Sequence, residues 1–357
     1  MSLGGQADST RARAAAALAA GEYLTAIAAL EQLVDAGATI GENVDVYFEL
    51  VRARAASGDM PAAIALLEEI VRVLRSDGGA QLVWALVWLA CARDDEGDDD
   101  GAALDLAEAK AVAGADWYSQ VRIGWAEARI ADGRGRHRHA AKQIAEVIQL
   151  LERGDDLEQL ARAHVLASTI ALGAGRLAEA ATACETAAQL GSSSLRAEDR
   201  AILLANRGRI AAARGDGLLA TQLGHDALRL VEGSDPSTEA RALWTVAEGL
   251  AAQHLYDDAA AAFDRALELA PAERRLVRPI LEARDAMNAR RPPAEPGVFR
   301  DLVTALHSIA AALASVQQTL DSLRGQPHQP PPPPAPSPRR PELQVLPGDR
   351  RRAPRDP

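Results

Sequence analysis

Residues that favour β-strands are scarce in this sequence. Aromatic residues make up only 3% of the 357 residues, whereas alanine alone supplies 78 of them. Because alanine favours helices, and β-branched and aromatic side chains favour strands, the composition almost excludes an all-β fold and disfavours an α/β fold. Few large side chains are present to fill a thick core. The composition therefore predicts an all-α fold of closely packed helices in a thin layer.

Positive charge is also scarce, and lysine occurs only at Lys110 and Lys142. The formal net charge is −11. Residues 326–357 carry six arginines against three acidic residues and residues 297–325 are balanced, which leaves −14 for residues 1–296. A nucleic-acid-binding protein neutralises phosphates with a basic face. We therefore expect no nucleic-acid partner for the acidic body of the chain.

Cysteines and long apolar runs are scarce as well. Cys91 and Cys184 are the only cysteines, and their helical surroundings predict small buried side chains in a reducing compartment. No run approaches the roughly 18 apolar residues that read as a membrane span. The first residues lack the basic and apolar regions of a signal peptide. The sequence therefore predicts a cytoplasmic protein without a membrane segment.

Motifs of catalysis and metal binding are missing. The sequence contains no Walker A loop, dinucleotide fingerprint, nucleophile elbow or His-Glu-x-x-His motif. The acidic run 94–100 lacks the spaced ligands of a calcium loop. We interpret it as a solvated turn, with a docking point for a basic segment as the alternative. We expect no catalytic residue, cofactor or metal.

A basic turn, formed by residues 134–139, follows the acidic run one repeat later. His137 and His139 stand among three arginines there and lack a nearby third ligand, so metal binding is disfavoured. We interpret this turn as exposed. The acidic and the basic turn could also pair between two molecules.

An internal repeat of 37 to 40 residues runs through three quarters of the chain. Each of seven units has a turn residue, which is glycine in all but the last: Gly21, Gly58, Gly97, Gly135, Gly175, Gly215 and His254. Five residues after each turn stands an alanine: Ala26, Ala63, Ala102, Ala140, Ala180, Ala220 and Ala259. Residues nine and twelve after the turn are mostly apolar. These offsets share one face of a helix, so each unit reads as a helix, a tight turn and a second helix.

Glycine and alanine have different roles in this pattern. Glycine enters positive φ without a clash, which suits a tight turn after a helix. The fixed alanine marks the position at which two helices approach most closely. A larger side chain there is expected to overpack the contact by roughly 1–3 kcal/mol.

At these positions the chain resembles the tetratricopeptide repeat family. The clearest matches are Ala17-Leu18-Ala19-Ala20-Gly21-Glu22-Tyr23 with Ala26-Ile27, Ser57-Gly58-Asp59 with Ala63-Ile64, and Tyr256, Ala259, Phe263, Ala266-Leu267 and Pro271. The resemblance covers about residues 7–273. The period is nearer 40 than the family's roughly 34 residues, which is similar to the longer repeats of bacterial regulators of the maltose-activator type.

The resemblance implies a right-handed α-solenoid of about seven helical pairs, whose first helices line a concave groove that binds peptide or protein segments. Tryptophan and arginine are enriched in binding hot spots, so an aromatic residue with an arginine one turn away is a plausible anchor. The alternative is that the tryptophans pack between helices and the arginines are solvated. The predicted groove residues are Phe48, Arg52, Trp84, Trp88, Trp125, Arg129, Arg209, Trp244 and Glu248.

A different period begins after the Pro-rich stretch 291–297. Apolar residues step by three and four in strict alternation, which is the heptad signature of a coiled coil. The predicted oligomerisation residues are Phe299, Leu302, Leu306, Ile309, Leu313, Val316, Leu320 and Leu323. The alternative is a helix folded back on the solenoid. We predict five parts: a disordered N-terminus (1–6), the solenoid (7–290), a linker (291–297), the amphipathic helix (298–325) and a Pro-rich disordered tail (326–357).

The sequence as a whole predicts a non-enzymatic scaffold that binds a protein or peptide segment of unknown identity. A coiled coil at 298–325 would make it a homo-oligomer and add avidity. The alternative is a regulatory sensor that holds a small ligand. A closed apolar pocket would favour the sensor. An open groove lined by tryptophan and arginine would favour the scaffold.

Overall fold

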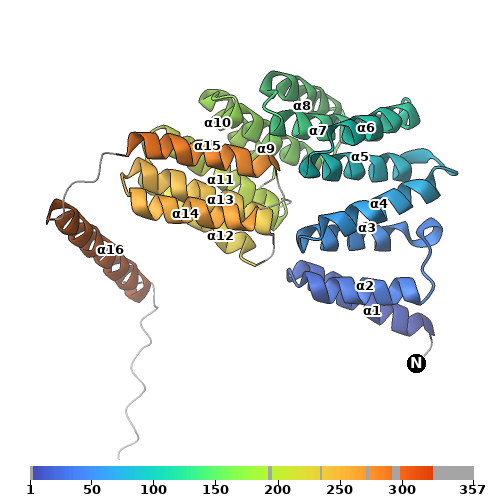
Figure 1. Ribbon diagram of the computed structural model, residues 1–357, viewed down its shortest axis with the longest axis horizontal. Coiled ribbons are helices and arrows are strands. Elements are labelled where there is room, and N and C mark those ends of the chain that lie inside the picture. The colour runs from blue at the N-terminus through green and yellow to red at the C-terminus, as the bar shows by residue number, and fades with distance from the viewer. Residues whose placement is uncertain (1–2, 192–194, 234, 271–273, 292–297, 325–357) are drawn as a thin grey trace, which may run out of the picture. The chain divides into compact units, whose positions relative to one another are not determined.

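All elements that the computed structural model describes are α-helices. The structure describes residues 3–191, 195–233, 235–270, 274–291 and 298–324, and Figure 1 shows the helices in chain order. The chain divides into two compact units, residues 1–291 and 292–357. The tail predicted at 326–357 lies outside the described residues. None of the described helices has the length and hydropathy needed to cross a membrane.

The first unit consists of seven helical pairs and one further helix, α15 (Arg274–Arg290). Each pair forms an antiparallel hairpin around one of the predicted turns, and the fold is a tetratricopeptide-repeat-like solenoid, as predicted. The pairs are α1 (Leu3–Ala19) with α2 (Tyr23–Asp35), α3 (Ile40–Ala56) with α4 (Met60–Leu74), α5 (Gly79–Glu96) with α6 (Asp99–Ala113), α7 (Trp117–Gly133) with α8 (His137–Leu151), α9 (Leu157–Gly173) with α10 (Leu177–Leu190), α11 (Ala197–Ala213) with α12 (Gly217–Val231), and α13 (Pro236–Ala252) with α14 (Tyr256–Leu269).

The turns within the pairs have the left-handed backbone that the repeated glycine predicts. All six turn glycines have positive φ, from +71° at Gly175 to +87° at Gly97. In the seventh pair, His254 adopts the same conformation at φ +64° and is the one described non-glycine residue with positive φ. Aspartates complete several turns, and the side chains of Asp59 and Asp216 accept hydrogen bonds from the first turn of the next helix.

The repeated alanines lie at the centre of each hairpin. All seven are at most 1% exposed, as the close helix contact predicts. The apolar residues nine and twelve positions after the turn are buried beside them, including Leu30, Leu67 and Phe263. Small and large side chains therefore alternate along several of the second helices, such as α4 with Ala63, Leu67 and Ile70, whereas the contact positions of α12 are the small residues Ala220, Gly224 and Ala227.

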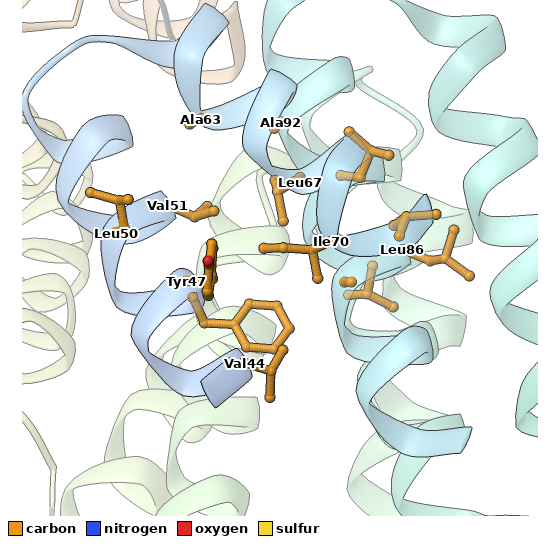
Figure 2. Packing of buried hydrophobic residues seen from close by; sticks show 14 of the residues in the cluster. Val44, Tyr47, Leu50, Val51, Ala63, Leu67, Ile70, Leu86 and Ala92 are labelled. Atoms are coloured by element: carbon orange, nitrogen blue, oxygen red, sulfur yellow. The ribbon is translucent and has the colours of Figure 1, made fainter. Parts of the chain in front are cut away.

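The buried cluster of the N-terminal half extends from Ala14 of α1 to Ile130 of α7. Val44, Tyr47 and Val51 of α3 meet Leu67 and Ile70 of α4, with α5 on the other side (Figure 2). Leu67 is 1% exposed and Ile70 is fully buried. Burying each such side chain contributes about 1.5–3 kcal/mol. The core between these helices is thin, and buried residues from neighbouring helical pairs belong to the same cluster.

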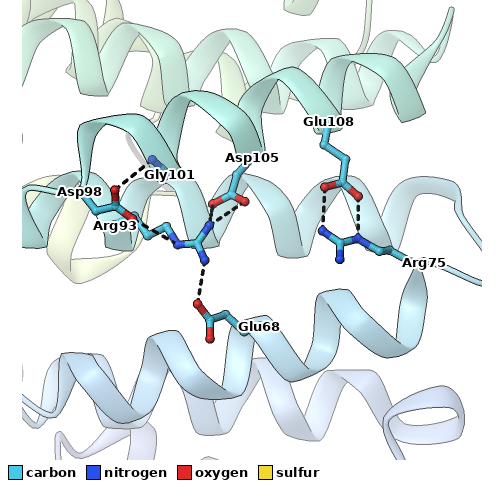
Figure 3. Close-up of polar contacts among 7 residues, drawn as sticks. All are labelled: Glu68, Arg75, Arg93, Asp98, Gly101, Asp105 and Glu108. Atoms are coloured by element: carbon cyan, nitrogen blue, oxygen red, sulfur yellow. Dashed lines mark hydrogen bonds and ion pairs between the residues drawn. The ribbon is translucent and has the colours of Figure 1, made fainter.

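Ion pairs connect the second helices of neighbouring pairs. Arg93 of α5 bonds Glu68 of α4 at 2.7 Å and Asp105 of α6 at 2.8 Å (Figure 3). Arg75 at the end of α4 forms a bidentate pair with Glu108 of α6, with both contacts at 2.8 Å. Bidentate pairs fix orientation as well as distance. These contacts set the angle between the second and third pairs.

Two of the predicted segment boundaries, at the N-terminus and at the linker, can be compared with the structure. Helix α1 begins at Leu3, so residues 3–6, predicted to be disordered, continue the first helix. Extending an existing helix costs much less than starting one, and the buried Ala14 and Ala17 anchor this helix further along. The first compact unit ends at Arg291, where the linker was predicted. In the second unit, α16 (Val298–Arg324) coincides with the predicted amphipathic helix.

Candidate functional site

The first helices of the later pairs form one layer, which we call the inner wall. It consists of α5, α7, α9, α11 and α13, each in contact with the next. Two cavities of about 660 Å³ and about 430 Å³ lie along this wall. They share Trp125, Arg129 and Arg162. We call this continuous surface the groove.

The larger cavity contains five of the predicted groove residues. Arg52 comes from α3, Trp84 and Trp88 from α5, and Trp125 and Arg129 from α7. The sixth, Phe48, does not line the cavity. It is 5% exposed and supports the wall from behind, with its ring centroid 5.2 Å from that of Trp84 and 5.5 Å from that of Trp88.

An arginine that the sequence analysis missed also lies in the larger cavity. The guanidinium of Arg122 stands 3.7 Å from the centroid of Trp84 and 4.7 Å from that of Tyr118. Arg122 and Tyr118 both come from α7, one turn apart, whereas Trp84 comes from α5. The stack therefore depends on how two helical pairs meet. The spacing of Tyr118 and Arg122 was the only signal in the sequence that could have indicated it.

The smaller cavity contains the remaining predicted groove residues in a bonded group. The guanidinium of Arg209 lies 3.5 Å from the ring centroid of Trp244, and its Nε donates to Glu248 at 3.0 Å. The indole Nε1 of Trp244 donates to the same carboxylate at 2.9 Å. Trp244 is only 4% exposed. At this position the tryptophan is mostly packed between helices, and it lines the cavity together with its partners Arg209 and Glu248.

Helix α15 lies across the inner wall and covers the smaller cavity. It contacts α5, α7, α13 and α14, and it contributes Arg275, Arg278, Pro279, Glu282 and Ala283 to the lining. The sequence predicted that this segment belongs to the solenoid, but not that it lies over the groove. Its buried residues Leu276, Ile280 and Met287 have ordinary helical spacing, which does not tell one packing partner from another.

The acidic turn is less solvated than predicted. Asp94 and Asp95 are 6% and 7% exposed, because they belong to the last turn of α5 and face other helices. Asp95 bonds Arg129 of α7 at 2.5 Å and lies 3.7 Å from Arg275 of α15. Asp94 bonds Arg134 at 2.7 Å. Burial raises the pKa of Asp94, and the hydrogen bond from Arg134 opposes that shift.

The acidic and basic turns pair with each other, but within one chain. Arg134 of the basic turn contacts Asp94 and also Asp99, the latter at 3.2 Å. His137 bonds Asp132 through Nδ1 at 2.9 Å. Within the described ranges, no group of three or more His, Cys, Asp or Glu residues is arranged to hold a metal ion. The basic turn therefore contributes ion pairs between the third and fourth helical pairs.

The two cysteines occupy different places. Cys184 is 2% exposed in the core of the fifth pair, and Cys91 is partly exposed on the wall of the larger cavity. Burial raises the pKa of both thiols. A raised pKa leaves little reactive thiolate at neutral pH.

The predicted seam of α16 carries exposed apolar side chains. Leu306, Ile309, Leu313 and Val316 are between 54% and 64% exposed. Phe299, Leu302, Leu320 and Leu323 belong to the same helix, but their side chains lie outside the described residues. Self-association of this helix stays a prediction.

Comparison with known proteins supports the fold. The tetratricopeptide repeat family profile matches residues 17–83. No curated protein sequence matches the chain. A chain of the APC/C hetero-tetramer Cut9-Hcn1 is structurally similar, with a TM-score of 0.55 and 16% sequence identity. The similarity covers 81% of the present chain but only about half (49%) of the Cut9-Hcn1 chain. A Rap protein complexed with competence and sporulation factor has a TM-score of 0.50 and 11% identity, over 88% of this chain and 93% of that chain.

Proposed function

We propose that this chain, a tetratricopeptide-repeat protein, is a non-catalytic scaffold that binds a peptide or protein segment in its groove. The observation that carries the proposal is the larger cavity, where three tryptophans and several arginines from different helical pairs line about 660 Å³ of open space. Tryptophan and arginine dominate the energetics of protein interfaces because they bury large areas and donate several hydrogen bonds. The ring contacts among Phe48, Trp84 and Trp88 restrict these side chains before a partner binds, which lowers the cost of ordering them.

The structural relatives are consistent with this function. The Rap protein was crystallised with competence and sporulation factor, and the APC/C chain is part of a hetero-tetramer. Both proteins therefore have a molecular partner. Because the identities are 16% and 11%, the proposal depends on the groove of this chain and not on the relatives.

The test is capture of partners by the full chain and by groove variants. Trp125→Ala removes one of the three side chains that both cavities share, and Arg52→Ala removes an exposed cation of the larger cavity. We expect both variants to retain less of a partner identified by mass spectrometry. Leu104→Ala and Arg200→Ala are the controls, because both residues are exposed and neither lines either of the two cavities. Equal capture by groove and control variants would refute binding in the groove.

Multimerisation by α16 is the second part of the proposal. Isolated apolar side chains on a surface are ordinary, but four at heptad spacing form a continuous stripe. A coiled coil would bury this stripe and bring several grooves to one target, which adds avidity without new contacts.

One observation favours a second candidate, a sensor of a small ligand. Helix α15 covers the smaller cavity, whose volume of about 430 Å³ suits a small molecule. Inorganic phosphate, citrate and ATP are suitable anionic probes, since arginines line this cavity. Binding would raise the melting temperature, and Arg278→Ala would reduce the rise. Unchanged melting temperatures with all three probes would count against the sensor.

A further inference from the structure

We propose that the larger cavity holds a bulky apolar side chain of an acidic partner segment, with a partner carboxylate bound to Arg122. The inference rests on the proposed function of the groove and adds the chemistry of the partner. Three observations support it: the concentration of aromatic rings, the state of Arg122 and the charge of the cavity.

Aromatic side chains gather at this one place. The chain has only twelve aromatic residues, and five of them, Phe48, Trp84, Trp88, Tyr118 and Trp125, line or support the larger cavity. Trp84 and Trp88 pack edge to face, with centroids 6.0 Å apart. Both are partly exposed although they belong to the hydrophobic cluster. An apolar side chain entering the cavity would cover ring surface that water now contacts.

Arg122 is best understood by comparison with Arg209. Each guanidinium stacks on a tryptophan, at 3.7 Å from the centroid of Trp84 and 3.5 Å from that of Trp244. Arg209 also donates to Glu248. Within the described ranges, Arg122 forms no ion pair with a carboxylate. The pKa of Asp116 is lowered chiefly by its hydrogen bonds with Ser119 at the start of α7, and the charge of Arg122 contributes least.

The stacking of Arg122 on Trp84 and Tyr118 orients its guanidinium so that it can bind an anion. A guanidinium held by its faces keeps its N–H donors in the plane, where a carboxylate can accept two of them. At Arg209 the chain supplies that carboxylate itself. At Arg122 we infer that the partner supplies it, so that Trp84 and Tyr118 orient the guanidinium as Trp244 orients Arg209.

The charge of the cavity has the opposite sign to that of the body. Five arginines line the larger cavity, Arg52, Arg122, Arg129, Arg162 and Arg196, against two acidic residues, Asp95 and Asp235. Three of these arginines already have carboxylate partners, because Arg129 pairs with Asp95, Arg162 with Asp199 and Arg196 with Glu158. The positive charge that the cavity offers a partner therefore comes from Arg52 and Arg122. Residues 1–296 as a whole carry a net charge of −14. A basic site on an acidic protein selects acidic segments, because the body repels them everywhere except at the site. A basic segment would meet like charges inside the cavity.

Three short fluorescein-labelled peptides test the proposal on the full chain by fluorescence anisotropy. The first has a phenylalanine among glutamates, the second a phenylalanine among lysines, and the third an alanine among glutamates. We expect the first to bind about tenfold or more tightly than either other peptide. The lysine peptide lacks the carboxylate that accepts a hydrogen bond from Arg122, and the alanine peptide lacks the aromatic side chain that the cavity would bury. High salt should weaken its binding, because exposed charges are screened.

The residue assignment is tested with Arg122→Gln, which keeps a planar polar group but removes the charge. Affinity for the acidic phenylalanine peptide should fall about tenfold, with Arg122→Lys intermediate. Arg200→Gln is the matched control, an exposed arginine outside both cavities. Unchanged melting temperatures would show that the variants are folded.

Each outcome decides something. Equal affinity for the acidic and basic peptides, or no measurable binding of any peptide, overturns the inference. So does an Arg122→Gln variant that binds like the wild type. Tighter binding of the lysine peptide, sensitive to Trp125→Ala, would reject the acidic partner and leave the groove as a peptide site. The proposed function itself fails only if groove variants capture partners as well as their controls do.

Discussion

Arg275 of α15 lies 3.7 Å from Asp95 of α5, so the last helix of the first unit is tied to the third helical pair. Asp95 is 7% exposed and also bonds Arg129 of α7 at 2.5 Å. Three elements that are distant in the sequence therefore share one carboxylate. This carboxylate therefore links α15 to the inner wall beneath it, in addition to the buried apolar contacts of Leu276 and Ile280.

We predict that Asp95→Asn destabilises the first unit. Removing one partner of a buried ion pair costs about 3–5 kcal/mol, because the remaining guanidinium charges lose their counter-charge. The midpoint of urea unfolding, followed by circular dichroism, should fall. Glu96→Gln is the matched control, since Glu96 is the next residue and is exposed. Similar midpoints for the two variants would contradict the role of the Asp95 pair.

His254→Gly is expected to stabilise the seventh pair. A residue with a Cβ pays roughly 1–2 kcal/mol in the left-handed conformation, and His254 has φ +64°. The loss of its exposed hydrogen bond to Tyr256, at 3.0 Å, should offset only part of the gain. The melting temperature should rise. Gly215→Ala is the reverse test, because a Cβ there meets no atom within 4 Å and the expected loss is purely conformational. A lower melting temperature for His254→Gly would refute this account.

Ala180→Leu is expected to lower the melting temperature. Ala180 is fully buried where the two helices of the fifth pair meet, so a larger side chain must displace its neighbours at roughly 1–3 kcal/mol. Ala178→Leu, on the exposed side of the same helix, should have little effect. Ala220→Leu repeats the test in the sixth pair. Melting temperatures equal to that of Ala178→Leu would show that the fixed alanine is not a tight contact.

These positions also show which features the sequence could predict. The turns at Gly21 to His254 and the buried alanines follow from local rules, namely φ preferences and helical spacing. Such rules act within one helical pair, where sequence distance and spatial distance agree. The seven pairs and their contact faces were therefore predictable.

Features that depend on how the pairs stack were not predictable in the same way. The burial of Asp94 and Asp95, the stack of Arg122 on Trp84 and the placement of α15 all join different helical pairs. Small rotations between neighbouring pairs accumulate along a solenoid and decide which residues meet. A period of 37 to 40 residues sets the repeat but not these rotations. For Phe48 and Trp244, the repeat placed both residues on first helices, but it could not give their depth of burial, at 5% and 4% exposed.

His164 should make stability depend on pH. Burial lowers its pKa in the folded protein, with the charge of Glu152 opposing the shift. As the pH falls through the unfolded value of about 6.5, the unfolded chain takes up a proton that the folded chain does not. Stability should therefore decrease as the pH falls through that value, and level off below the folded pKa. His164→Gln should flatten this part of the profile in urea unfolding, whereas His225→Gln, at an exposed position, should not. Identical profiles for wild type and His164→Gln would exclude this contribution.

The apolar seam of α16 is expected to join two or more copies of the chain. If Leu306 and Leu313 face a partner helix, Leu306→Glu with Leu313→Glu places like charges in a seam that should be apolar, and the complex should dissociate. Sedimentation equilibrium of the full chain should then give the monomer mass. Ser308→Glu with Ala311→Glu adds the same charge on the opposite face of the same exposed helix, and should leave the mass of the wild type unchanged. A wild-type mass already equal to one chain, or equal masses for both double variants, would mean that the stripe does not join chains. The groove and its partner would then act in a monomer, without the avidity that a coiled coil adds.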